Sequence, residues 1–170
     1  MNTVNCFKII KDLFNINRSL TGKGNLKTLR YIKKIVPKLK IKYFNTGERY
    51  YDWTIPKEWN VTDAYIEDLK GKKVIDFKKN NLHLVGYSEP IKKIVKKKEL
   101  LEHLHSLKNN KKAIPYVTSY FNKYWGFCLT HEQKVKLKDE KYMVYIDSKF
   151  TNGKMHYGEL IHKGKSDKEI

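Results

Sequence analysis

Apolar positions near the start of the chain recur with the period of two amphipathic helices. The first helix is predicted over Thr3–Phe14 and the second over about Asn25–Ile35, because apolar side chains return there every three or four residues. Pro37 helps to end the second helix. The stretch between the two helices, Asn17–Gly24, has the polar and glycine-containing composition of a loop.

From Ile41 onward the pattern changes to short stretches typical of β-strands. Strands are predicted at Ile41–Phe44, Arg49–Ile55, Val61–Glu67, Lys73–Phe77, Leu82–Tyr87, Trp125–Leu129 and Tyr142–Asp147. Helices are predicted at Lys98–Leu107, after a lysine-rich link, and at Glu132–Leu137. The segment Met155–His162 follows the turn Asn152-Gly153 and is expected to pair with the preceding strand as a hairpin.

The order of these elements predicts an α+β fold: two N-terminal helices, a mixed and mainly antiparallel β-rich region with a helix, and a C-terminal β-hairpin. A chain of 170 residues suits one domain, or one domain with a short appendage. It has no apolar run of the roughly 18 residues that a membrane span needs, and its start lacks the pattern of a signal peptide. Cys6 and Cys128 lie far apart outside any CxxC pattern, so we expect a reduced, cytoplasmic protein.

The charge of the chain changes this picture little. A net charge of +18 suggests an anionic partner such as nucleic acid or a membrane surface. However, only three of the 36 basic residues are arginines, Arg18, Arg30 and Arg49. Phosphate-binding proteins favour arginine, whose planar fork grips phosphate with two hydrogen bonds. The abundance of Lys, Asn, Ile and Tyr instead fits an A+T-rich genome, and we expect no specific nucleic-acid partner and no membrane partner.

Two groups of residues carry the types of side chain that metal binding or nucleophilic catalysis needs. His103 and His105 flank Leu104 on a predicted helix, where positions i and i+2 point about 200° apart and cannot share a metal ion. On a strand, the same pair could share one. Cys128 and His131 are close in sequence, but a Cys–His nucleophile needs a third group to orient the histidine, and none is evident. A buried structural thiol is the expected role of Cys128.

Two further features admit a binding role. The stretch from Arg18 to Gly24 resembles an anion-binding loop before a helix but lacks the phosphate-loop pattern, so a helix–helix turn is expected. Aromatic residues are dense and interleaved with lysine, which would suit stacking on bases or sugars. Such side chains more often form a core or a cleft wall. The aromatic residues in question are Trp53, Trp59, Trp125, Tyr50, Tyr51, Tyr116, Tyr120 and Tyr124.

Five blocks, in order along nearly the whole chain, resemble one protein family. They are LFNINRSLTGKG (Leu13–Gly24), YDWTIPKEWNVTDAY (Tyr51–Tyr65), VIDFKKNNLHLVGYSEP (Val74–Pro90), IPYVTSYFNKYWGFCLTH (Ile114–His131) and YIDSKFTNGKMHYGELIHK (Tyr145–Lys163). They are similar to bacterial aminopeptidase-like proteins, which combine a zinc-peptidase-type domain, a small inserted domain of unknown function and a C-terminal winged helix. The family's genes often lie among surface-polysaccharide or flagellin-modification genes.

The resemblance implies chemistry that this chain is not expected to perform by itself. In the full-length family, two zinc ions activate water against a peptide or aminoacyl substrate. The first metal-binding segment, a Cys-His-Pro-Ser-like stretch, is expected shortly after Tyr157–Leu160, yet no Cys-His-Pro occurs here. We therefore expect a truncated, N-terminal metallopeptidase fragment without catalytic or metal residues and without a cofactor of its own. Its expected partner is the missing C-terminal peptidase-like portion.

The resemblance also implies a division of the chain. Residues 1–43 would be N-terminal helices of the incomplete peptidase-like domain, 44–141 the inserted α+β domain, and 142–170 a hairpin that returns to the first domain. Candidates for residues facing the substrate cleft are Asp52, Trp53, Trp125 and His131, and a structural role in the insert is equally open for them. Two alternatives remain: a stand-alone binding module that retains the inserted domain, or a basic, non-specific nucleic-acid-binding protein.

Overall fold

The computed structural model describes residues 5–120, 122–162 and 164. Two helices begin the described chain, α1 (Cys6–Phe14) and α2 (Lys23–Ile35), as the apolar spacing predicted. Asn5 starts α1 because its side chain accepts a hydrogen bond from the backbone N–H of Lys8. Thr3 and Val4, which were expected in this helix, lie outside the described residues.

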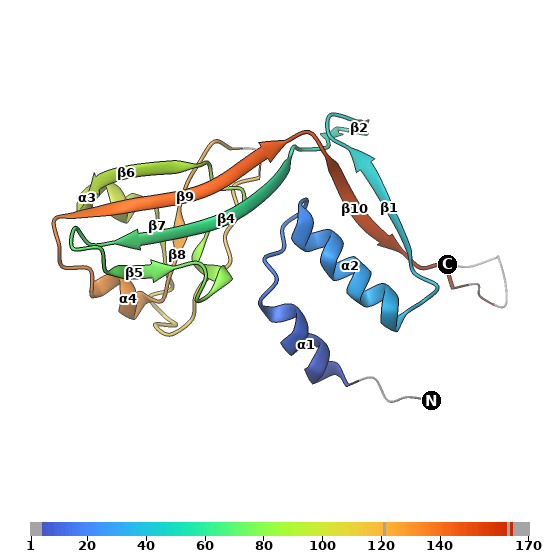
Figure 1. The fold of residues 1–170 in the computed structure, drawn as a ribbon, viewed down its shortest axis with the longest axis horizontal. Helices are drawn as coiled ribbons and strands as arrows, with labels where there is room; N and C mark the ends of the chain where they lie inside the picture. Colours follow the sequence, from blue (N-terminus) through green and yellow to red (C-terminus); the bar gives the residue numbers. More distant parts are fainter. Residues whose placement is uncertain (1–4, 121, 163, 165–170) are drawn as a thin grey trace.

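A four-stranded antiparallel sheet forms the main body of the molecule, in the order β5-β4-β9-β6 (Figure 1). Its two long central strands are β4 (Glu58–Glu67) and β9 (Lys141–Thr151), which pair from Glu58↔Thr151 to Glu67↔Met143. The edge strands are β5 (Lys73–Asp76) and β6 (Ile91–Lys96). Helices α3 (Lys97–Glu102) and α4 (His131–Val135) also belong to this body.

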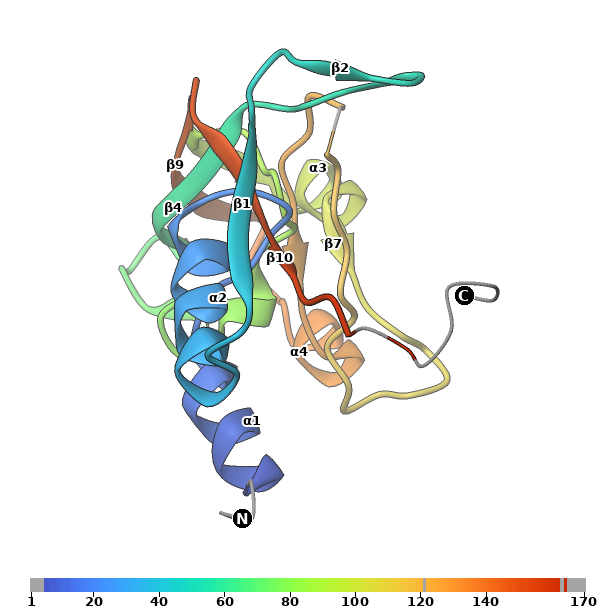
Figure 2. The ribbon, with the colours of Figure 1, turned by 90° about the vertical axis from the view of Figure 1, so that its right-hand side faces the viewer.

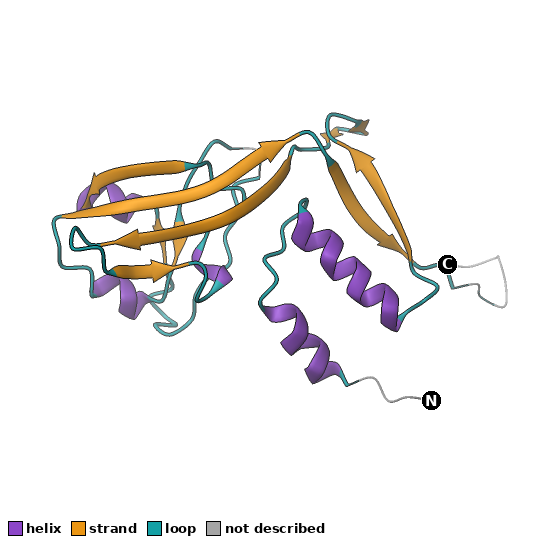
Figure 3. Cartoon of the chain, viewed as in Figure 1, coloured by secondary structure: helices purple, strands orange, loops and turns teal. Residues whose placement is uncertain are grey.

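A second, thinner layer lies at the other end of the long axis (Figures 1 and 3). There β1 (Lys40–Asn45) pairs antiparallel with β10 (Lys154–Glu159), and α2 packs beside both strands. Gly158 lies close to Leu29 of α2 and to Leu39. The α+β class with mainly antiparallel sheets is therefore confirmed.

The expected hairpin between the last two strands needs correction. β9 pairs with β4 and β6, whereas β10 pairs with β1. The turn at Asn152-Gly153 forms, but it is held against the end of β1: the Thr46 N–H donates to the Gly153 carbonyl (3.0 Å), and the Gly153 N–H donates to Thr46 Oγ1 (3.1 Å). These bonds direct the chain away from β9 and onto a different partner strand.

Three other predicted elements differ from the structure. Arg49–Ile55 is a small hairpin, β2 (Arg49–Tyr50) and β3 (Trp53–Thr54), which projects at one end of the view in Figure 2. Leu82–Tyr87 is not a regular strand, because the Asn80 side chain accepts from the Leu82 N–H and starts the 3₁₀ turn η1 (Asn81–His83). The helix expected at Lys98–Leu107 ends at Glu102, and β7 (Leu104–His105) follows, parallel to β8 (Phe127–Cys128).

The hydrophobic core lies in the four-stranded body. Its cluster of buried side chains is drawn from the sheet, α3, β8 and the loops around them, including Ile66, Leu100, Phe127, Val144 and Ile146. Among the described residues, neither α1 nor α2 has a buried side chain. None of the described helices is long and apolar enough to cross a bilayer.

Candidate functional site

The predicted His-x-His pair lies at the end of the expected helix and not within it: His103 caps α3, and His105 belongs to strand β7. The rings of His103 and His105 both contact Tyr124. His105 Nε2 lies 2.9 Å from the Tyr124 hydroxyl. Burial, with Lys134 and His103 as lesser causes, lowers the pKa of His105. A neutral His105 is thus suited to hydrogen bonding with the phenol.

Trp125 completes this aromatic group. Its ring stacks on His103 with 3.7 Å between ring centroids, and its carbonyl lies 2.6 Å from His103 Nδ1. Trp125 is half-buried and packs against the core cluster. The backbone contact and the stacking together fix the His103 ring against Trp125.

Cys128 and His131 do not form a nucleophilic pair. The Cys128 thiol is fully buried, and this burial raises its pKa to about 11, so it stays protonated at neutral pH. The Cys128 carbonyl oxygen lies 2.8 Å from Nδ1 of the buried His83 ring. His131 instead lies 3.0 Å from Ser106 Oγ through its Nδ1. The expectation of a buried structural thiol is confirmed.

The other two cleft candidates, Asp52 and Trp53, lie on the β2–β3 hairpin. Asp52 is exposed next to Tyr51, whose backbone has a φ of 57°, and Trp53 is half-buried opposite Tyr50. Trp125 and His131 belong to a different part of the chain, beside β8 and at the start of α4. That all four face a substrate cleft stays a prediction.

The loop between α1 and α2 is bonded to the sheet body through hydrogen bonds that the sequence did not predict. Thr21, which is buried, lies 2.6 Å from the Tyr87 hydroxyl through its Oγ1 and accepts from the Trp59 N–H at 3.0 Å. The Asn60 side chain accepts from the N–H of Lys23, the first residue of α2. Gly22, with a φ of 94°, permits this close approach to β4. The expected helix–helix turn is therefore also attached to the sheet body by hydrogen bonds.

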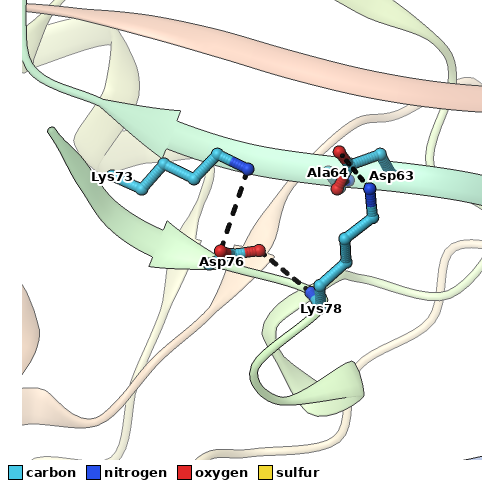
Figure 4. Close-up of polar contacts among 5 residues, drawn as sticks. All are labelled: Asp63, Ala64, Lys73, Asp76 and Lys78. Atoms are coloured by element: carbon cyan, nitrogen blue, oxygen red, sulfur yellow. Dashed lines mark hydrogen bonds and ion pairs between the residues drawn. The ribbon is translucent and has the colours of Figure 1, made fainter. Parts of the chain in front are cut away.

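Two ion pairs lie along the β5 edge of the sheet, one within β5 and one between β4 and the residues just after β5 (Figure 4). Lys78 Nζ lies 3.0 Å from Asp63 Oδ2, and this contact raises the pKa of Lys78. Lys73 lies 3.8 Å from Asp76 and also sits over the Tyr65 ring. Each carboxylate has a basic partner, which indicates a structural role for this edge.

Comparison with known proteins places this geometry in a family. Residues 58–149 match the family described as a domain of unknown function, DUF2172. This match covers β4 to β9, the sheet that holds the core. The chain belongs to the DUF2172 family.

Two longer proteins from Clostridium acetobutylicum resemble the chain beyond that region. One, provisionally named a polysaccharide biosynthesis protein with an aminopeptidase-like domain, is 46% identical over 164 residues. The other is a crystal structure of a protein provisionally described as a peptidase, with 47% identity, a TM-score of 0.85 and coverage of 89% of this chain. This DUF2172 chain spans 38% of the length of the first and 36% of the second. The predicted relationship to aminopeptidase-like proteins is confirmed.

The described part of this DUF2172 chain does not fit the zinc site that the resemblance implies. Within residues 5–120, 122–162 and 164, no group of three or more His, Cys, Asp and Glu side chains is placed to hold a metal ion. His83, His103, His105 and His131 are held in hydrogen bonds to protein groups.

Sequence reasoning missed Ser106, Tyr124, Thr21 and Tyr87 as partners in these contacts. Thr21 lies in the glycine-containing loop considered as an anion site, Tyr124 is among the aromatic residues considered for stacking, and Tyr87 ends a predicted strand. None of these patterns indicates the contacts that the residues make, because only the fold brings them to their partners.

Proposed function

We propose that this chain is a non-catalytic part of an aminopeptidase-like protein. Its second layer (α2, β1 and β10), together with α1, would dock onto the zinc-binding peptidase portion. The observation that carries the proposal is the contrast between the two ends of the molecule. The four-stranded body closes a core of its own, whereas α1 and α2 present apolar side chains to solvent. A surface of this kind marks an interaction site.

At this end of the molecule, exposed apolar side chains lie on α1, at the end of α2 and just after β10. Phe7 and Ile10 are 76% and 63% exposed, although they define the apolar face of α1. At the far end of the layer, Ile35 and Ile161 line a broad depression of about 650 Å³. Each large apolar side chain left in water forfeits about 1.5–3 kcal/mol of burial free energy. A partner that covers this layer would recover that free energy.

The longer relatives supply a partner of suitable chemistry. The matched region accounts for well under half of each, and one of them is provisionally named for an aminopeptidase-like domain. We propose that the rest of such a protein carries the zinc ligands and binds a peptide or aminoacyl substrate. It would also supply an apolar surface that covers α1 and β10. By itself, this chain would then be inactive and bind no zinc.

The proposal is tested by reconstitution. This chain is mixed with a polypeptide equivalent to the unmatched remainder of the Clostridium acetobutylicum relative, and copurification and zinc-dependent hydrolysis of an aminoacyl p-nitroanilide are measured. We expect a complex with activity, and neither activity nor bound zinc for this chain alone.

Matched variants locate the docking surface. The double variant Ile10→Lys and Ile161→Lys should abolish the complex, because it places charge in the apolar contact. Ile94→Lys, the same substitution at an exposed isoleucine of β6, should leave the complex intact. Hydrolysis by the isolated chain, or assembly that tolerates the double variant, would contradict the proposal.

A further inference from the structure

A cleft lies where the end of α1 meets the four-stranded body, apart from the docking layer's far end and from the His103–Trp125 group. Its volume is about 320 Å³, within the range of small-ligand pockets. One wall is the segment from Phe14 to Arg18, and the opposite wall is η1 with Leu84 and Tyr116. The cleft is therefore built from two segments that are far apart in the sequence.

The two walls are fixed to each other by hydrogen bonds. Asn81 Nδ2 donates to the Phe14 carbonyl at 2.9 Å, which joins η1 directly to the end of α1. A few residues further on, the Thr21–Tyr87 contact at 2.6 Å joins the same loop to the body. Such bonds hold the cleft open in one shape, so a ligand would not have to order it.

The lining combines one positive charge with an apolar floor. Ile16 and Leu82 are half-buried and Leu84 is buried. Arg18 lies at the rim and donates from Nη1 to the Leu13 carbonyl, which positions the guanidinium. Among the ion pairs of the described residues, none involves Arg18. A guanidinium has five N–H donors, so one bond to a carbonyl leaves most of its donor capacity available.

We propose that this cleft binds the carboxylate of a small apolar ligand of amino-acid to dipeptide size, with Arg18 pairing with the carboxylate and Ile16, Leu82 and Leu84 receiving the apolar group. The planar fork of arginine matches a carboxylate with two parallel hydrogen bonds. The binding chemistry rests on the cleft alone. That the carboxylate is the C-terminus of a short peptide rests on the proposed function.

Binding is measured on the intact chain by two-dimensional NMR titration with three probes. Glycyl-leucine carries both the carboxylate and the apolar group, glycyl-leucinamide lacks the carboxylate, and 4-methylpentanoate lacks the peptide. We expect saturable shifts at Ile16, Leu82 and Tyr116 with glycyl-leucine and no saturation with the amide. Saturation with 4-methylpentanoate as well would assign the site to carboxylates in general, whereas its failure would assign the site to peptides.

Variants at two arginines separate recognition from a structural role. Arg18→Gln should weaken glycyl-leucine binding by about tenfold or more, because a charged hydrogen bond is lost. Arg30→Gln makes the same change of charge on α2, outside the cleft, and should leave the affinity unchanged. Thermal unfolding of both variants shows whether Arg18 merely holds the end of α1.

The proposal fails if acid and amide bind equally, or if neither binds. It also fails if Arg18→Gln lowers the melting temperature but leaves the affinity as it was. Should Arg18→Gln not fold, the comparison of acid with amide on the unaltered chain still decides. None of these readouts depends on a peptidase partner, so failure of the reconstitution experiment is a separate result.

Discussion

Thr21 and Tyr87 meet through their hydroxyl groups at 2.6 Å, and this contact joins the loop before α2 to the four-stranded body. Tyr87 is almost fully buried and has a φ of 64°, a conformation that non-glycine residues rarely adopt. Its ring stacks on Trp59, whose backbone N–H also donates to Thr21 Oγ1. One threonine hydroxyl therefore holds two groups of the body, and its loss should be more damaging than the loss of the phenol.

We predict that Tyr87→Phe lowers the free energy of unfolding by about 0.5–1.5 kcal/mol, the usual contribution of one hydrogen bond. Thr21→Val should cost about 1–3 kcal/mol, because it leaves the buried Trp59 N–H without an acceptor. Thr62→Val, at an exposed position of β4, is the matched control and should stay within about 0.5 kcal/mol of the parent. Urea unfolding measures all three. Equal effects of Thr21→Val and Thr62→Val would contradict the argument.

Burial lowers the pKa of His83 from its ordinary value of 6.5, and its ring contacts the Cys128 carbonyl. Below about pH 6.5 the unfolded chain takes up a proton that the folded chain resists, so stability present above that pH is lost as the pH falls toward the folded pKa. The pKa values of His105 and His156 are also lowered, which adds in the same direction. Stability should therefore fall between neutral pH and mildly acidic pH.

The variant His83→Asn isolates one part of this dependence. Its amide N–H can still donate to the Cys128 carbonyl, but it cannot be protonated in this range. The plot of unfolding free energy against pH should become flatter, without becoming level, because His105 and His156 still titrate. Chemical denaturation at several pH values makes the comparison. An unchanged slope in the variant would show that His83 is not a source of the pH dependence.

Binding to nucleic acid is predicted to be weak, independent of sequence and sensitive to salt. The basic charge of the chain consists almost entirely of lysines, and lysine–phosphate contacts gain free energy mainly through counterion release. Fluorescence anisotropy with unrelated DNA and RNA at about 50 and 200 mM salt tests this. Sequence-selective binding that survives the higher salt would favour a nucleic-acid-binding function instead.

Elements with strong periodicity or alternation could be predicted from the sequence, and elements set by distant contacts could not. The apolar stripe of α2 and the alternation in β4 indicated their structures correctly. Strand β6 was predicted to be a lysine-rich link. Of its six residues only Ile91 and Val95 are buried or half-buried, and its three lysines obscure the alternation typical of a strand. Lysines on an edge strand hinder association through that edge, and this composition hides the strand from pattern analysis.

The candidate site was less predictable than the fold. The spacing of His103 and His105 was visible, but its meaning depended on where the helix ends. The structure ends α3 before His103 and pairs Leu104 and His105 in parallel with β8. This pairing joins residues more than 20 positions apart along the chain. Arg18 was noticed as part of a loop, whereas its position opposite Asn81 and Tyr116 exists only in the folded chain.

The last prediction concerns the unequal stability of the two ends of the molecule. Ile10 of α1 is 63% exposed, so Ile10→Ser should change the free energy of unfolding by no more than about 0.5 kcal/mol in the isolated chain. Val144→Ala, a smaller change at a fully buried position of β9, should cost more, about 1–3 kcal/mol, because it opens a cavity in the core.

Hydrogen exchange should likewise show fast amides in α1, α2, β1 and β10, and slow amides where β4 pairs with β9. When the peptidase portion of a longer relative is added, the amides of α1 and β10 should slow, because the partner covers them. Uniform protection along an isolated, monomeric chain, together with a large cost for Ile10→Ser, would show that α1 already has its packing partner and that no docking surface exists there.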